Sequence, residues 1–262
     1  MRAESLGIPT LLERPDAAAS AALCAELGLG FVECNANLPA FSDPAAVDAR
    51  ALRRIARETG TAFTLHLDER LDACDFNPGV RRAWRETFRR ALALAAEAEM
   101  PVVTLHLNLG VYFTLPEGRV FLYEREKPLF LEGLCALRDL AEREAAPGTA
   151  VCVENTGGFP PFAREGLERL LENPAFGLTM DVGHLRAAGN ADADFFAAHA
   201  DRVRHLHLHD CRGRHDHLPL GTGELDWRRA LAFARERRIR TVVEVKTEEA
   251  LRASVRALQE TG

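Results

Sequence analysis

The chain has 262 residues, of which 47% are hydrophobic and 27% are charged, a composition typical of a globular protein with a large core. No apolar run reaches the roughly 20 residues that a membrane span needs, and the first ten residues lack the apolar stretch of a secretory signal, so we expect a cytoplasmic protein. The net charge of −6 and the six scattered cysteines point away from nucleic-acid binding and from a disulfide framework.

Short segments rich in Val, Leu, Phe and Thr alternate with stretches rich in Ala, Arg, Glu and Leu along the whole chain. The predicted strands are Ser5–Leu11, Gly30–Asn35, Ala62–Asp68, Pro101–Asn108, Thr149–Thr156, Phe176–Asp181, Arg202–Asp210 and Arg240–Lys246. The predicted helices are Pro15–Leu27, Pro44–Thr59, Gly79–Glu99, Glu124–Glu144, Ala163–Glu172, Asp192–His199, Asp226–Arg237 and Thr247–Glu260.

Eight βα units in about 250 residues predict a closed (β/α)8 TIM barrel that occupies residues 1–262 as a single domain. The alternative is an open doubly wound sheet. Such a sheet usually has fewer strands and a glycine-rich phosphate turn after the first one, and the segment after the first predicted strand has no such turn.

Histidines are concentrated at the predicted strands, and only His199 belongs to a predicted helix. The others are His66, His106, His184, His205, His207, His209, His215 and His217. Polar and leucine residues alternate in segments 64–68, 104–108 and 205–209, so we expect the leucines to pack against the helices and the polar residues to point into the barrel near its mouth. His205 lies deeper in its strand and is interpreted as structural, and His209 is left open.

Three carboxylates, Glu154, Asp181 and Glu244, lie at or near the ends of predicted strands five, six and eight. Without compensation, carboxylates in one barrel mouth would repel each other and cost several kcal/mol each to desolvate. Either some of the carboxylates stay protonated or a cation lies between them, and carboxylates mixed with imidazoles suit Zn, Mn, Fe or Co. We therefore predict a divalent metal site. Each feature alone also has a plain structural interpretation; for example, Glu244 could simply pair with Lys246.

Several motifs resemble those of the xylose-isomerase-like barrel superfamily. They are Val-Glu-Asn-Thr at 153–156, Met-Asp-Val-Gly-His at 180–184, His-Leu-His-Asp at 207–210 and His-Leu-Pro-Leu-Gly-Thr-Gly at 217–223, and segment 243–245 is similar to the last-strand motif. This superfamily includes sugar isomerases, ketose 3-epimerases and apurinic-site endonucleases of the endonuclease IV type. The resemblance extends over the chain through the strand order, and its specific motifs lie in the second half.

The resemblance to the epimerases implies one Mn or similar ion held by Glu154, Asp181, His207 and Glu244. The two glutamates would be the catalytic pair that moves protons on the sugar, with the metal as Lewis acid. Substrate oxygens would be bound by a histidine matching His184 and by Arg212 or Arg214. Lys246 would tune Glu244. This is the first expected function: a metal-dependent isomerase or epimerase of a sugar or sugar phosphate.

The resemblance to the endonucleases implies up to three zinc ions and a hydrolytic reaction through metal-activated water. The matching ligand positions are His66, His106, Glu154, Asp181, His184, His207, His217 and Glu244. The ninth ligand of that family is an Asp, and here the position is His215, beside Asp216. A phosphodiesterase or other hydrolase is therefore the alternative function. A non-catalytic metal or sugar binder is a third, which the full set of acid and base candidates disfavours.

Other segments indicate which kind of molecule binds at the site. The best basic run is Arg81, Arg82, Arg85, Arg89 and Arg90, and it lies on one predicted helix, where it is interpreted as a solvated face. We expect a small sugar or phosphoester as substrate, no nucleic acid and no membrane, and leave open whether the chain forms a homo-oligomer. The insertion 110–127 follows a strand end, so Tyr112 and Phe113 are predicted to line or cover the substrate site.

Overall fold

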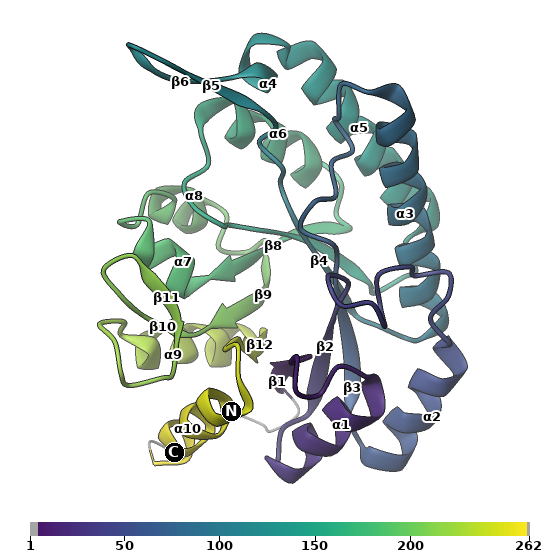
Figure 1. Cartoon of the computed structure of the whole chain (residues 1–262), viewed down its shortest axis with the longest axis vertical. Helices are drawn as coiled ribbons and strands as arrows, with labels where there is room; N and C mark the ends of the chain where they lie inside the picture. The colour runs from purple at the N-terminus through teal and green to yellow at the C-terminus, as the bar shows by residue number, and fades with distance from the viewer. Residues whose placement is uncertain (1–4, 261–262) are drawn as a thin grey trace.

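The computed structural model describes residues 5–260, so residues 1–4 and 261–262 of the predicted single domain lie outside the described part. Eight parallel strands close into a barrel in the order β1-β12-β9-β8-β7-β4-β3-β2 (Figure 1). The barrel strands are β1 (Leu6–Pro9), β2 (Phe31–Asn35), β3 (Ala62–His66), β4 (Val102–His106), β7 (Ala150–Glu154), β8 (Phe176–Asp181), β9 (Val203–Leu208) and β12 (Arg240–Val243). The predicted fold class, a (β/α)8 TIM barrel, is confirmed.

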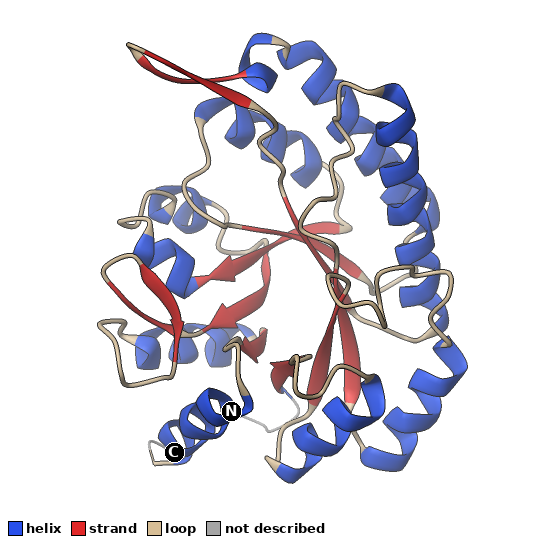
Figure 2. Ribbon diagram, viewed as in Figure 1, coloured by secondary structure: helices blue, strands red, loops and turns tan. Residues whose placement is uncertain are grey.

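The helices surround the barrel and form its outer layer (Figure 2). They are α1 (Ala17–Glu26), α2 (Ala49–Thr59), α3 (Pro78–Glu97), α4 (Leu122–Arg125), α5 (Lys127–Glu144), α6 (Pro161–Leu171), α7 (Val182–Ala187), α8 (Ala193–Ala198), α9 (Trp227–Arg237) and α10 (Glu248–Gln259). Within residues 5–260, no helix combines the length and the apolar character that crossing a membrane would take.

Local side-chain chemistry explains where two of the helices depart from their predicted bounds. The helix predicted from Pro44 begins at Ala49, because the Asp48 carboxylate accepts hydrogen bonds from the next backbone N–H groups and caps the first turn there. The helix predicted over 124–144 is divided into α4 and α5, and Pro128 lies in the first turn of α5. Proline cannot donate a hydrogen bond in a helix interior and disfavours helical geometry in the residue before it.

Two antiparallel hairpins follow barrel strands and were not predicted. After β4, the strands β5 (Tyr112–Leu115) and β6 (Gly118–Phe121) form a hairpin that projects from the body of the molecule (Figure 1). After β9, the predicted strand 202–210 ends at Leu208, and β10 (Asp210–Arg212) pairs with β11 (His215–Leu218). Both hairpins belong to the loops at the C-terminal ends of the barrel strands, which form the face where TIM barrels build their sites.

The alternation in the strands separates the two sides of the barrel wall as predicted. Leu65, Leu105 and Leu206 are fully or nearly fully buried in the core between strands and helices. The opposite parity gives the barrel a polar interior, where the Thr104 and Thr179 hydroxyls lie 3.2 Å apart. TIM-barrel interiors are usually filled by branched apolar residues, so a polar interior indicates that this space has another use.

A substitution at the contact between α5 and α6 would test the packing of the outer layer. Phe130 is fully buried, and its ring lies 5.2 Å from that of Tyr123 and 5.3 Å from that of Phe162. We expect Phe130→Ala to lower the free energy of unfolding by about 3–5 kcal/mol, because it leaves a cavity that the neighbouring rings cannot fill. In the control, Leu12→Ala removes a side chain on a residue that is 78% exposed. That change should stay within about 0.5 kcal/mol in the same denaturant titration. Equal losses in the two variants would contradict the packing described here.

Candidate metal centre at the barrel mouth

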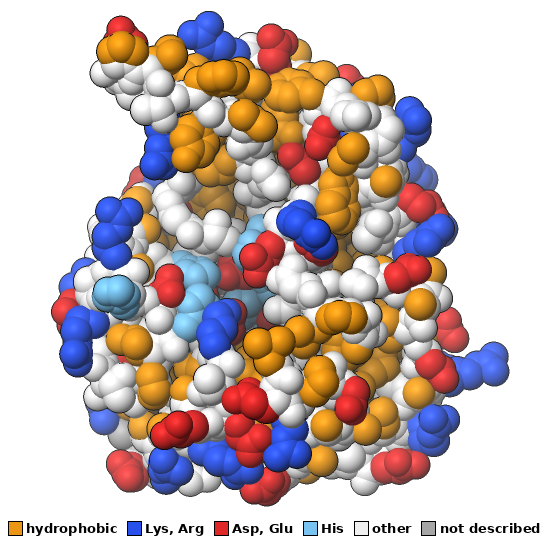
Figure 3. All heavy atoms as spheres, in the orientation of Figure 1, with side chains coloured by type: hydrophobic (Ala, Val, Ile, Leu, Met, Phe, Trp, Pro, Cys, Tyr) orange, Lys and Arg blue, Asp and Glu red, His pale blue; other side chains and the backbone are white. Residues whose placement is uncertain are grey.

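Strand register brings the predicted carboxylates and imidazoles to one end of the barrel. His106 of β4 pairs with Glu154 of β7, and Asp181 of β8 pairs with His207 of β9. Glu244 follows β12, where its backbone N–H donates to the Leu208 carbonyl. Figure 3 shows histidine and acidic side chains gathered in the hollow near the middle of this face. Residues far apart in the sequence therefore converge on one small volume.

Glu154, Asp181, His207 and Glu244 form the central cluster, in which one donor atom of each lies within 4.8 Å of the others. His207 Nδ1 is 2.8 Å from Glu244 Oε2, 3.3 Å from Glu154 Oε2 and 3.9 Å from Asp181 Oδ2. All but Glu244 are buried, and the Glu244 side chain is only 14% exposed. Three carboxylates and one imidazole at this spacing match the ligands that zinc or manganese prefers.

A further cluster flanks the central one on each side. His66, His106 and Glu154 form the first flanking cluster, with the two Nε2 atoms 3.0 and 3.4 Å from Glu154 Oε2. Asp181, His184, His209 and His217 form the second flanking cluster. Glu154 and Asp181 each belong to two clusters, so each carboxylate lies between two groups of donor atoms.

Some buried polar atoms at this site make no hydrogen bond, and a bound cation would give them a partner. His207 Nδ1 and Glu244 Oε2 lie 2.8 Å apart as an ion pair but, like His207 Nε2 and His217 Nε2, they are buried and make no hydrogen bond of good geometry within residues 5–260. His66 Nδ1 lies 2.8 Å from the Leu67 carbonyl, which can only accept, so this nitrogen carries a proton. In the neutral ring the Nε2 lone pair then faces Glu154. Buried polar atoms are rarely left unpaired, so the donor set fits a divalent cation.

The charges around Glu154 hold the histidines in their protonated form when only protons are present. Burial lowers the pKa of His66, but the hydrogen bond and charge of Glu154 outweigh it and raise the pKa to about 9. Burial also lowers the pKa of His184, and the charge of Asp181, followed by Glu154, raises it to about 9. Burial raises the pKa of Glu154, and the imidazoles, His207 first, bring it well below the ordinary value. Protons and a metal ion therefore compete for the same positions.

His209 positions Asp181. The His217 backbone N–H donates to His209 Nδ1 at 2.8 Å and lies closer to it than the Asp210 carbonyl, at 3.2 Å, so the proton of a neutral His209 ring is on Nε2, which lies 3.0 Å from Asp181 Oδ2. His217 has a positive φ of 53°, which is uncommon for a residue other than glycine. Gly183 makes room for the ring, because a Cβ there would lie 2.0 Å from His209 Cε1. His209, which the sequence left open, thus orients a carboxylate.

Asp210 fixes the loop that brings His217 to the site. Its carboxylate accepts four backbone N–H groups at 2.9 Å each, those of Cys211, Gly221, Gly223 and Leu225. The hairpin formed by β10 and β11 is therefore tied to the loop that follows it. Asp216 then lies 3.7 Å from His184 Nε2 and 2.9 Å from His217 Nδ1, measured from its two oxygens.

Some predicted site residues are not brought to the clusters. His215 is exposed on β11, and its neighbour Asp216 contacts the second flanking cluster instead. Arg212 and Arg214 are exposed on the same hairpin, and Arg212 donates to the Thr222 carbonyl. Lys246 Nζ does contact Glu244, at 2.9 Å.

The aromatic insertion forms a hairpin, and its two predicted site residues are exposed on it. Tyr112 is 45% exposed and Phe113 56% exposed on the projecting hairpin. Tyr112 packs against Phe121 of the same hairpin, with the rings 5.7 Å apart, and Arg119 lies over its face. Both side chains therefore lie on a locally packed hairpin that projects from the body of the molecule (Figure 1), and their role at the substrate site stays a prediction.

Sequence reasoning missed one buried carboxylate, Glu33 of β2. It is 2% exposed and lies beneath the central cluster, 2.9 Å from His205 Nε2 and 2.9 Å from His207 Nε2. Glu33 shares its strand parity with Phe31 and Asn35, and His205 and Phe31 have ring centroids 6.0 Å apart inside the barrel. The signal was an acidic residue at an inward position of a buried strand.

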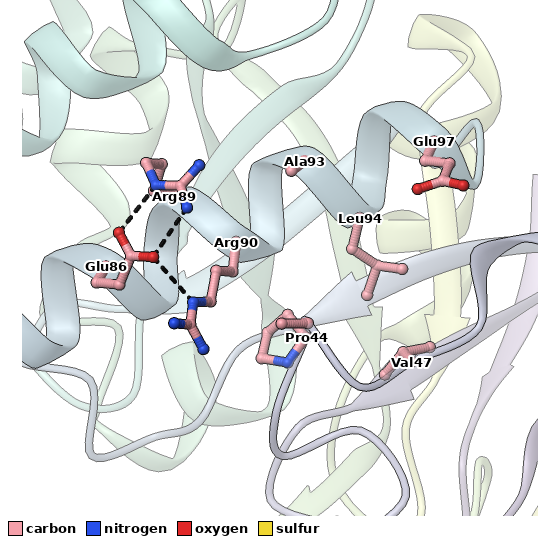
Figure 4. A pocket seen from close by; sticks show the side chains of 9 residues that line it. Pro44, Val47, Glu86, Arg89, Arg90, Ala93, Leu94 and Glu97 are labelled. Carbon is pink, nitrogen blue, oxygen red and sulfur yellow. Dashed lines mark hydrogen bonds and ion pairs between the residues drawn. The ribbon is translucent and has the colours of Figure 1, made fainter.

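Two arginines of the run on α3, Arg89 and Arg90, pair with acidic neighbours. Arg89 and Arg90 both bind the Glu86 carboxylate, and Figure 4 shows these contacts beside a surface groove of about 410 Å³. Arg90 also lies 3.7 Å from Asp43. Exposed pairs of this kind are typical of a solvated helix face.

Comparison with known proteins places the chain among barrels of one type. The family model described as xylose isomerase-like TIM barrel matches residues 21–261. The uncharacterized protein MJ1614 of Methanocaldococcus jannaschii is 25% identical over 198 residues, which are 74% of this chain and 71% of that protein.

Two solved structures superpose on nearly the whole chain. The TTHB071 protein from Thermus thermophilus, soaked with ZnCl2, is 28% identical with a TM-score of 0.69, and 98% of this chain and 99% of that chain are covered. The 3-keto-D-glucoside 4-epimerase YcjR from E. coli is 18% identical with a TM-score of 0.76, and 98% of each chain is covered. The second likeness shows the fold.

A substitution of Gly183 would test whether His209 is needed for metal binding at the clusters. We expect Gly183→Ala to displace the His209 ring, lower the free energy of unfolding by about 1–3 kcal/mol and weaken zinc binding about 10- to 100-fold, measured by chelator competition. Gly157→Ala is the matched control, since a Cβ there meets nothing within 4 Å. It should change neither quantity. Undiminished zinc binding in Gly183→Ala would contradict the role given to His209.

The raised histidine pKa values predict a pH dependence of the metal-free protein. In the fold, His66 and His184 have a pKa of about 9, against 6.5 for an ordinary histidine. Their protonated forms therefore stabilise the fold fully below about pH 6.5, and this stabilisation is lost as the pH rises through 9, by up to about 1.4 kcal/mol per pH unit for each proton. Thermal unfolding in chelator should show the decline, and His66→Gln should make it shallower. A stability that stays flat from about pH 6.5 to 9 would contradict these pKa values.

Proposed function

Because the chain belongs to the xylose isomerase-like TIM barrel family, we propose that it is a divalent-metal-dependent isomerase or epimerase of a small sugar or sugar phosphate. The observation that supports this most is the central cluster of Glu154, Asp181, His207 and Glu244, whose donor atoms lie within 4.8 Å of one another. Several solved structures of this fold are of proteins named as epimerases of keto-sugars.

A divalent ion in the central cluster would act as a Lewis acid that makes a C–H next to a sugar carbonyl more acidic. The two glutamates differ in their freedom to move that proton. Glu154 is 1% exposed, and its two oxygens lie 3.0 to 3.5 Å from four imidazoles, those of His66, His106, His184 and His207. Glu244 is more exposed, at 14%, and fewer imidazoles surround it: Oε2 lies 2.8 Å from His207 Nδ1, and Oε1 lies 3.4 Å from His217 Nε2.

We assign the proton transfer to Glu244, with Lys246 holding its other oxygen at 2.9 Å. A single base removes a proton and returns it on one side of the sugar, which is the geometry of an aldose–ketose isomerisation. An epimerisation needs a proton donor on each face, and Glu154 is too enclosed by imidazoles to supply the second. The site residues therefore favour isomerisation within the proposed class.

Deuterium incorporation tests this assignment. The protein, reconstituted with Mn²⁺ or Zn²⁺, would be incubated in D2O with a panel of ketohexoses, aldohexoses and their phosphates, and the carbon next to the carbonyl monitored by NMR. We expect exchange in the wild type and a loss of at least about 100-fold in Glu244→Gln. The matched control is Glu249→Gln, an exposed residue in the first turn of α10, which should keep full exchange. Exchange that persists in Glu244→Gln would contradict the role of Glu244.

A second candidate is a phosphoester hydrolase, and the flanking clusters favour it. Glu154 and Asp181 each lie between two groups of donor atoms, which is the placement of carboxylates that bridge metal ions. Two or three ions would lower the pKa of bound water and stabilise charge on a phosphate. In this reaction, Glu154 and Asp181 would be metal ligands. Glu154 would not need to move a proton, so its enclosed position would suit this role.

The number of bound ions separates the two candidates. Chelator-treated protein would be reconstituted with zinc, freed of excess metal and analysed for zinc per chain, alongside hydrolysis of small phosphomonoesters and phosphodiesters. One ion per chain, unchanged in His66→Gln, supports the isomerase. Two or three ions, with one lost in His66→Gln and none lost in the control His199→Gln, support the hydrolase. His199 follows α8 and contacts Phe195 and Glu168, which belong to none of the three clusters.

A further inference from the structure

We infer that a groove at the base of the projecting hairpin binds a second sugar unit, so that the substrate of the central cluster is a reducing sugar of two or more units. The groove has a volume of about 510 Å³ and lies between the loop that follows β3 and the hairpin that follows β4. Its lining includes Asp72, Asp75, Phe76, Asn108, Val111 and Tyr123. The inference rests on the proposed function, because the metal centre would act on the first sugar unit.

Tyr123 forms the buried wall of the groove. The residue is 1% exposed, and its hydroxyl donates to Asp72 Oδ2 at 2.6 Å. Gly110, with a φ of 69°, lies against the ring, because a Cβ there would be 2.5 Å from Tyr123 Cε2. The Leu122 backbone N–H donates to the Val111 carbonyl and closes the hairpin at this point. The base of the hairpin is therefore held against the loop after β3, and the groove between them is preformed.

The groove has an exposed aromatic ring. Phe76 is 38% exposed, and its ring contacts that of Tyr123 with the centroids 5.1 Å apart. Val111, which also lines the groove, is 59% exposed. Figure 3 shows hydrophobic side chains gathered near the projecting hairpin. An aromatic face carries partial negative charge, so it attracts the C–H groups on the flat side of a sugar ring.

One acceptor and one donor of the groove have no partner of their own. Asp75 Oδ1 accepts from the Asn77 N–H at 2.6 Å, and Asn108 Oδ1 accepts from the Gly110 N–H at 2.9 Å. Among residues 5–260, the second oxygen of Asp75 and the side-chain NH2 of Asn108 make no hydrogen bond. A ligand in the groove would therefore meet an acceptor and a donor beside an aromatic face.

This combination selects a neutral ligand with several hydroxyl groups. The carboxylates of Asp72 and Asp75 would repel an anion. A purely apolar ligand would bury the unpaired Asp75 oxygen and the Asn108 NH2 without hydrogen bonds. A cation would satisfy the carboxylates but would place positive charge against the Asn108 NH2. A sugar hydroxyl both donates and accepts, and a sugar ring also has an apolar face, so a sugar uses all of these groups.

The groove adjoins the metal ligands. His106 Nε2 lies 3.4 Å from Glu154 Oε2, and Asn108 follows His106 by two residues, which span at most about 7 Å of chain. Asp72 and Asn108 also line a smaller cavity together with His106. The next unit of a sugar held at the central cluster therefore extends toward Asn108 and into the groove.

The test compares sugars of one and two rings. The protein in ZnCl2 would be incubated in D2O with cellobiose, maltose, lactose and lactulose, and with glucose and fructose as the single-ring sugars, and deuterium exchange followed by NMR at several concentrations. We expect kcat/KM for at least one disaccharide to exceed that for its reducing unit by about 10-fold or more. Phe76→Ala should raise the KM for that disaccharide about 10-fold at unchanged kcat, and should leave the kinetics with glucose and fructose unchanged.

A second variant and a control accompany Phe76→Ala. Asp75→Asn keeps the size of the side chain and the acceptor for the Asn77 N–H, and it replaces the unpaired oxygen by an NH2. We expect it to weaken the disaccharide alone, again about 10-fold. The control is Leu115→Ala, a residue that is 41% exposed on the hairpin and is not part of the groove lining. It should change nothing. A disaccharide preference that both Phe76→Ala and Asp75→Asn retain would overturn the inference.

Binding distinguishes failure of the inference from failure of the proposed function. Dissociation constants of the same sugars would be measured by calorimetry with the wild type and Phe76→Ala in ZnCl2. Exchange with glucose or fructose that a second ring does not improve overturns the inference and leaves the proposed function standing. Absence of exchange with every sugar counts against the proposed function. The inference then stands if a disaccharide binds about 10-fold more tightly than its reducing unit and loses this advantage in Phe76→Ala, and equal affinities overturn it.

Discussion

The arrangement at the barrel mouth depends on the mutual repulsion of carboxylates that the fold holds together. Glu154, Asp181 and Glu244 come from three different strands or their ends, and each is buried or nearly so. In a medium that screens charge poorly, such a group is stable only if positive charge lies among the oxygens. Imidazoles surround them, and these can supply that charge as protonated rings or leave it to a metal ion.

The fold meets this requirement by separating its two tasks. Leucines on the outer side of the strands and aromatic rings between the helices supply the apolar burial that stabilises the barrel. The inner side is thereby free to bear Glu33, the threonines and the histidines, which contribute little apolar burial. Asp210 and Gly183 then place the loop and the imidazole that complete the site. Polar side chains inside the barrel are tolerated because the apolar core lies outside it.

The barrel and the central cluster could be predicted from the sequence, because both follow from strand periodicity. A period of two fixes which residues of a strand face inward, and parallel strands end on one face, so His207 and Glu154 could be placed without coordinates. The sequence could not predict that Asp216, rather than its neighbour His215, contacts the second flanking cluster. The hairpin has an irregular register at Asp210 and Arg212, and a positive φ at His217, and each breaks the simple alternation. Glu33 was overlooked because one acidic residue in an apolar strand has no local partner; the nearer of its histidine partners in the sequence is 172 residues away.

The most direct measurement of the central claim is anomalous X-ray scattering at the zinc absorption edge from crystals of the protein grown with ZnCl2. We expect a peak bonded to Glu154, Asp181, His207 and Glu244, with ligand distances of about 2.0–2.2 Å. Crystals in which these four side chains stay together but contact only one another, Lys246 and water, with no anomalous peak among them, would contradict it.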